Sequence, residues 1–88
     1  MKIKKEFVKR KVGEKYLVVT TGKSAASQSM FIEMNETSSY IWDCIEKGLS
    51  EKKIAEKLSK RFSIPLSRAA ADTNKLIASM REAGIFEN

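Results

Sequence analysis

The chain has 88 residues, of which 42% are hydrophobic and 32% are charged, so residues 1–88 suffice for a single domain with a modest core. It contains one cysteine, Cys44, and no histidine, which excludes an internal disulfide and a Cys/His metal site and removes the usual proton shuttle of neutral-pH catalysis. No run approaches the roughly 18 apolar residues of a membrane span and the basic start lacks the apolar stretch of a signal peptide, so we expect a cytoplasmic protein that binds no membrane. Because the sequence has no histidine, no Gly-rich phosphate loop and no nucleophile-base pair, we also expect that it is not an enzyme and needs no cofactor.

The net charge of +6 is unevenly distributed along the chain. Residues 1–16 contain seven Lys or Arg and two Glu, giving +5, whereas residues 17–88 contain ten and nine, giving +1. Clustered positive charge attracts an acidic peptide or a nucleic acid. Lysines also protect an edge strand from pairing with other chains, so both interpretations of the basic start stay open.

The first part of the chain predicts three strands, at residues 5–12, 16–21 and 30–34. Gly13 lies in the short link between the first two and suits a hairpin. The segment Leu17-Val18-Val19 is apolar on both faces, which is typical of a central strand. Short links favour an antiparallel meander, with the first and third strands at its edges.

The third strand is the less protected edge. Met30, Ile32 and Met34 alternate with Phe31 and Glu33, so the two sets face opposite sides. Glu33 is its only charged residue, whereas the first strand carries several Lys and Arg. An unprotected apolar edge either lies under a helix or accepts a guest strand. We therefore predict that all five residues contact a bound peptide, while some of them also serve the core.

Three helices follow the strands. Asn35 and Ser50 are good N-cap residues for the first two helices, and Gly48 ends the first of them. Pro65 interrupts the chain before a third helix, which runs from about Leu66 to Ala83. Ile85 and Phe86 should then fold back onto the core. This order predicts an α+β domain, winged helix-turn-helix-like, with a three-stranded antiparallel sheet followed by a three-helix bundle.

Four residues of the third helix share one side of it. Asp72, Lys75, Leu76 and Ser79 are spaced by three, four and seven, and we predict that they contact the same peptide. Lys75 suits pairing with a peptide carboxylate, and the alternative is a solvated lysine beside Asp72. Asp72 also suits a structural role, accepting hydrogen bonds near a helix start. Trp42 is expected to anchor the core.

Several segments resemble the PqqD-like family, in which coenzyme PQQ synthesis protein D is found. Residues 35–42 resemble its strand-to-helix joint, residues 54–58 resemble its next helix, and residues 64–66 with Asp72 and residues 76–84 resemble its closing pattern. The resemblance as a whole covers roughly residues 30–86. The fold that the resemblance implies is the one predicted above.

The resemblance also implies a function. Such proteins are recognition elements for RiPP precursors, that is, ribosomally made peptides that enzymes later modify. The leader segment binds as an added strand on the third strand, against the third helix, and is presented to a modifying enzyme, often a radical SAM (S-adenosylmethionine) protein. The products include peptide natural products and the cofactor PQQ. Glu46-Lys47-Gly48 replaces the usual Asp-Gly of the family, and this departure favours a product other than PQQ.

Two other functions fit the same architecture. A winged-helix DNA-binding protein brings clustered basic and amide groups to its recognition helix. Here Arg68, Asn74, Lys75 and Arg81 are spread over different sides of the third helix, which disfavours nucleic acid as a partner. The apolar edge also suits pairing with a second copy, so a homodimer stays open beside peptide binding.

Overall fold

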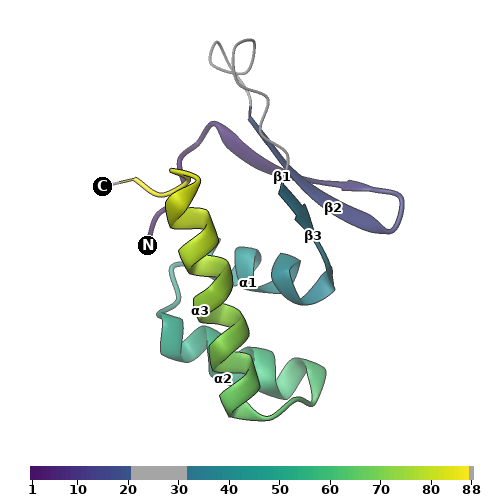
Figure 1. Cartoon of the computed structure of the whole chain (residues 1–88), viewed down its shortest axis with the longest axis vertical. Coiled ribbons are helices and arrows are strands. Elements are labelled where there is room, and N and C mark those ends of the chain that lie inside the picture. The colour runs from purple at the N-terminus through teal and green to yellow at the C-terminus, as the bar shows by residue number, and fades with distance from the viewer. Residues whose placement is uncertain (21–31, 88) are drawn as a thin grey trace.

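The computed structural model describes residues 1–20 and 32–87 and shows a small sheet followed by three helices (Figure 1). The predicted α+β, winged helix-turn-helix-like order is confirmed. Of the predicted third strand, Met30 and Phe31 lie outside the described residues. No helix among the described residues is long and apolar enough to cross a membrane. The elements are β1 (Phe7–Val12), β2 (Lys15–Thr20), β3 (Ile32–Met34), α1 (Glu36–Glu46), α2 (Glu51–Phe62) and α3 (Leu66–Glu82).

The sheet is antiparallel, and β2 lies between β1 and β3, as its apolar centre predicted. The first strand begins at Phe7 rather than at Lys5. Phe7 N donates a hydrogen bond of 3.1 Å to the carbonyl oxygen of Lys4, so the two residues between them belong to a turn. This turn redirects the chain from the N-terminal segment into the sheet.

The hairpin between β1 and β2 is tighter than expected. Its loop contains only Gly13 and Glu14, because Lys15 is already paired with Val12. Gly13 adopts a φ of 65°. A positive φ at the first central residue is what a type II′ hairpin turn requires, and glycine reaches it without a Cβ clash.

The two ends of the described chain lie side by side. Lys4 N donates to the carbonyl oxygen of Ile85 at 2.8 Å, and Ile3 forms an isolated antiparallel bridge with Phe86. Ile85 is fully buried, and Phe86 packs against the core. The predicted return of Ile85 and Phe86 to the core is therefore confirmed, and it ties the N-terminal segment to the end of α3.

The helices begin and end where their local signals predicted. The side chain of Asn35 accepts a hydrogen bond of 2.9 Å from Ser38 N, and that of Ser50 accepts one of 3.2 Å from Lys53 N. These two bonds satisfy backbone donors that an α-helix leaves without partners at its first turn. The core between sheet and helices contains the largest fully buried side chains, which are Trp42, Met34, Ile41, Ile45, Ile54, Leu58, Met80, Ile85 and Val18.

One lysine joins the sheet to α1. Lys9 of β1 points to the helix, and its side chain is only 14% exposed. Its Nζ lies 2.6 Å from Asp43 Oδ1, 2.5 Å from Ser39 Oγ and 3.2 Å from the carbonyl oxygen of Ser39. The ring of Tyr16 lies 5.1 Å away. The ammonium group therefore gains both charge pairing and hydrogen bonds for the water it loses.

Candidate functional site

The edge of the sheet formed by β3 is the first part of the candidate site. β3 pairs with β2 through Ile32 opposite Val18 and Met34 opposite Tyr16. β3 is the last strand of the sheet, so its other side has no partner strand among the described residues. Main-chain N–H and C=O groups on that side are the usual attachment points for an added strand.

The side chains of β3 divide between core and surface. Met34 is buried, and Ile32 packs partly against the core. Glu33 is exposed on the opposite side and pairs with Lys15 at 3.1 Å. Met34 and Ile32 therefore help to hold β3 in place, and a bound peptide would contact mainly the backbone of this strand.

A groove of about 340 Å³ adjoins the end of β3. One wall is the first part of α1 together with its cap residue Asn35, and the other wall is α3. All four residues that were predicted on the third helix line this groove, namely Asp72, Lys75, Leu76 and Ser79. These four residues share one side of α3, as their spacing predicted, and the structure brings that side next to the joint between β3 and α1.

The groove combines a small apolar base with charged walls. Ile41 is buried and Leu76 is half-buried, so Leu76 offers the accessible apolar contact. Lys75 is exposed. Asp72 pairs with Arg68, one turn earlier on α3, at 3.8 Å, rather than with Lys75. Both partners of this pair are substantially exposed, so it contributes little to stability and is easily exchanged for a ligand group.

The α1 wall of the groove and one of its cations were not predicted from the sequence. Asn35, Thr37 and Ser38 line the groove, and Asn35 Oδ1 also accepts a hydrogen bond of 2.8 Å from Thr37 Oγ1. Arg68 was considered only for DNA binding. It lies four residues before Asp72 and seven before Lys75, so helical spacing was sufficient to place it on this side of α3.

The polar groups of α3 do not form one basic face. Asn74 Nδ2 donates to Glu51 Oε1 of α2 at 3.1 Å, and the guanidinium of Arg81 lies 5.9 Å from the ring centre of Phe86. Arg68 is paired with Asp72. A recognition helix presents such groups together to the base edges of DNA. This arrangement argues against the DNA-binding alternative.

A three-stranded sheet followed by three helices, with an open strand edge beside a groove, defines a winged helix-turn-helix-like domain of the α+β class. The family model of coenzyme PQQ synthesis protein D (PqqD) matches residues 18–85, which is more than half of the chain. The chain therefore belongs to the PqqD family. No curated protein matches it.

A solved structure shares this fold. It is described as TbiB1 in complex with the TbiA(beta) leader peptide, and its TM-score is 0.78. The alignment covers 100% of this chain and 96% of that chain, at 15% identity. A likeness at this level of identity establishes the common fold, including the order of strands and helices.

Proposed function

We propose that this protein is a non-catalytic module that captures the leader segment of a ribosomally made precursor peptide and presents it to a modifying enzyme. The observation that carries the proposal is the open edge of β3 together with the groove between α1 and α3, which is lined by Asn35, the residue that follows β3. Membership of the PqqD family supports it, as does the shared fold with a protein that was solved with a leader peptide. The products include peptide natural products, and the enzyme is of the radical SAM class or a comparable cytoplasmic enzyme.

Main-chain pairing supplies only part of the affinity. The described part of β3 contains three residues, so a guest strand beside this part gains about two or three hydrogen bonds, each contributing about 1 kcal/mol net. A micromolar complex requires about 8 kcal/mol. Side chains in the groove must therefore supply most of the binding free energy.

The groove defines the side chains that a leader should bring. An apolar side chain placed on Leu76 over Ile41 contributes about 1.5 to 3 kcal/mol when it is fully buried. A carboxylate on the same segment suits Lys75 and, after exchange with Asp72, Arg68. We infer a leader that combines an apolar anchor with a nearby acidic residue.

A titration followed by NMR tests the proposal. Isotope-labelled protein is titrated with the leader of a short precursor encoded beside its gene, and separately with duplex DNA. We expect peptide-induced shifts in residues 32–38 and 66–82, because these form the edge and both walls of the groove. Shifts that occur only with DNA and weaken steeply with added salt would contradict peptide binding.

A second copy is the competing occupant of the β3 edge. If the protein dimerises through β3, leader binding should convert dimer to monomer, which sedimentation velocity measures directly. If a dimer that forms through β3 binds the leader without dissociating, the peptide binds elsewhere than on β3.

A further inference from the structure

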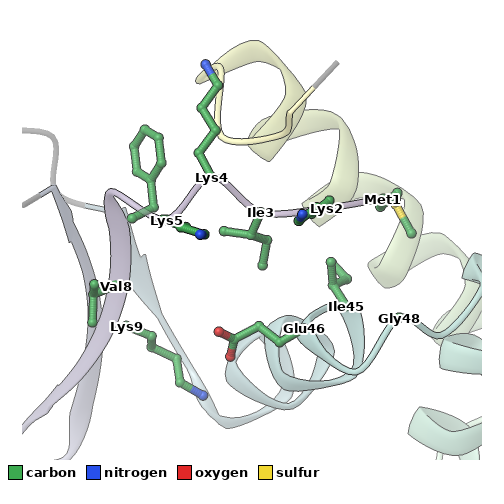
Figure 2. A pocket seen from close by; sticks show the side chains of 11 residues that line it. Met1, Lys2, Ile3, Lys4, Lys5, Val8, Lys9, Ile45, Glu46 and Gly48 are labelled. Carbon is green, nitrogen blue, oxygen red and sulfur yellow. The ribbon is translucent and has the colours of Figure 1, made fainter.

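A hollow of about 630 Å³ lies beside β1, the strand at the other edge of the sheet from β3. Figure 2 shows the side chains that line it. It is formed by the N-terminal segment, the first part of β1 and the end of α1. The end of α1 contributes Ile45 and Glu46, and Gly48 follows the helix. The groove is lined by Thr37, Ser38 and Ile41 of the same helix, so its nearest residue, Ile41, is about 6 Å from Ile45 along the helix axis at 1.5 Å per residue, and no residue lines both surfaces. The two surfaces are therefore separate.

The base of the hollow is apolar. Ile3 points from the N-terminal segment toward Ile45 and Glu46 of α1 (Figure 2), and Val8 of β1 is also among the lining residues. Ile3 and Val8 are half-buried, so both retain accessible apolar surface. This surface is small, and a single apolar side chain of a partner is sufficient to cover it.

The rim of the hollow is predominantly cationic. Its charged residues are four lysines and Glu46. Lys9 is held by Asp43, and Lys2 has only a long pair of 3.6 Å with Glu87, in which both side chains are substantially exposed. Lys5 is exposed and has no ion pair among the described residues, apart from the proximity of Glu46 across the hollow.

The positive charge continues along the sheet edge beyond the hollow. Arg10 and Lys11 of β1 are both exposed, whereas Glu6 is half-buried and already engaged in the protein. Residues 1–16 carry +5 of the total charge of +6. An extended acidic segment that begins at the hollow and follows β1 would meet cations over its whole length.

We propose that this basic edge, defined by Lys2, Lys5, Arg10 and Lys11, docks an acidic segment of a partner protein, with one apolar side chain of that segment in the hollow. The apolar base favours polypeptide over nucleic acid, because a nucleic acid backbone offers phosphates but no aliphatic side chain. The position at the β1 edge leaves β3 and the groove free. A leader and an acidic partner can therefore bind at the same time.

Two opposite charge changes test the proposal. The probe is a labelled synthetic peptide of glutamate and leucine, measured by fluorescence anisotropy at low salt. Lys5→Glu should weaken its binding about fivefold to tenfold, and Glu46→Gln should strengthen it about twofold to fivefold, because one removes an attraction and the other a repulsion. The gain in Glu46→Gln keeps the test informative if Lys5→Glu folds poorly.

Lys57→Glu on α2 is the matched control, because Lys57 is exposed, lies outside the hollow and undergoes the same change of charge. It should alter affinity less than twofold. Equal losses for Lys5→Glu and Lys57→Glu would overturn the proposal in favour of a diffuse effect of net charge. The proposal would also be overturned if a peptide of glutamine and leucine bound as tightly as the peptide of glutamate and leucine. It would likewise be overturned if single-stranded DNA bound more tightly than that peptide and responded to the same variants. Leader binding should be unchanged in Lys5→Glu, which separates this site from the groove.

Discussion

Leu76 and Ile77 are adjacent on α3, and replacing Leu76 by alanine tests the groove separately from the core. Leu76 is half-buried at the groove, whereas Ile77 is 4% exposed and belongs to the core. Leu76→Ala removes three carbon atoms, which are worth about 2.4 kcal/mol if a leader buries them completely. Because roughly two thirds of that surface is already covered in the free protein, we expect a loss of about 0.8 kcal/mol. This corresponds to an affinity about fourfold weaker.

Ile77→Val is the matched control for this prediction. It removes one carbon from the core and should lower the free energy of unfolding by about 0.5 to 1.5 kcal/mol without weakening leader binding more than twofold. Isothermal titration calorimetry with the leader measures affinity, and urea unfolding measures stability. If Leu76→Ala leaves affinity within twofold of the wild type, or if both variants lose affinity in proportion to stability, Leu76 is not a peptide contact.

Four further outcomes follow from other residues. Lys75→Glu should weaken an acidic leader about fivefold to tenfold while the urea midpoint stays unchanged, and an unchanged affinity would remove Lys75 from the site. Lys9→Met keeps the aliphatic stem but leaves Asp43 and Ser39 without their cation, so the free energy of unfolding should fall by about 1 to 3 kcal/mol. A loss below about 0.5 kcal/mol, which is the scatter of surface substitutions, would show that water replaces the lysine ammonium. Thr73→Val should raise the free energy of unfolding by about 1 kcal/mol, because the buried Thr73 hydroxyl has no hydrogen-bond partner among the described residues, and a decrease would reveal a partner. Burial, followed by the proximity of Cys44, raises the pKa of Tyr40 above 10, so folding favours the neutral phenol. The resulting contribution to stability is present below the ordinary pKa of tyrosine and is lost as pH rises through the raised pKa of Tyr40. An absorbance titration compared with Tyr40→Phe should show the ionisation of Tyr40 above the ordinary range.

The order of elements could be predicted because its signals are local. Asn35 and Ser50 cap their helices through hydrogen bonds to residues three positions later, so a short stretch of sequence contains the whole motif. Gly13 likewise marks its turn by a conformation that other residues rarely adopt. The apolar centre of β2 identified the middle strand because a strand covered on both faces shows no alternation.

The contacts between distant segments could not be predicted in the same way. In the sequence, nothing distinguishes Lys9 from the other lysines of the edge strand, because its pairing with Asp43 depends on where α1 crosses the sheet. The bridge between Ile3 and Phe86 joins segments at the two ends of the sequence, and neither has a periodic pattern that indicates its partner. For the groove, spacing alone placed Asp72, Lys75, Leu76 and Ser79 on one side of α3, but the opposite wall depends on the packing of α1 beside α3.

The position of α1 connects the two proposed surfaces. Its first turn, capped by Asn35, forms one wall of the groove, and its last turn, at Ile45 and Glu46, borders the basic hollow. Between these ends Lys9 fixes the helix to β1 through Ser39 and Asp43. A shift of α1 along its axis would change both surfaces together, and the buried ammonium opposes such a shift because it would lose its partners in a poorly hydrated position. Lys9→Met should therefore weaken leader binding and acidic-peptide binding together, whereas Leu76→Ala affects only the first and Lys5→Glu only the second.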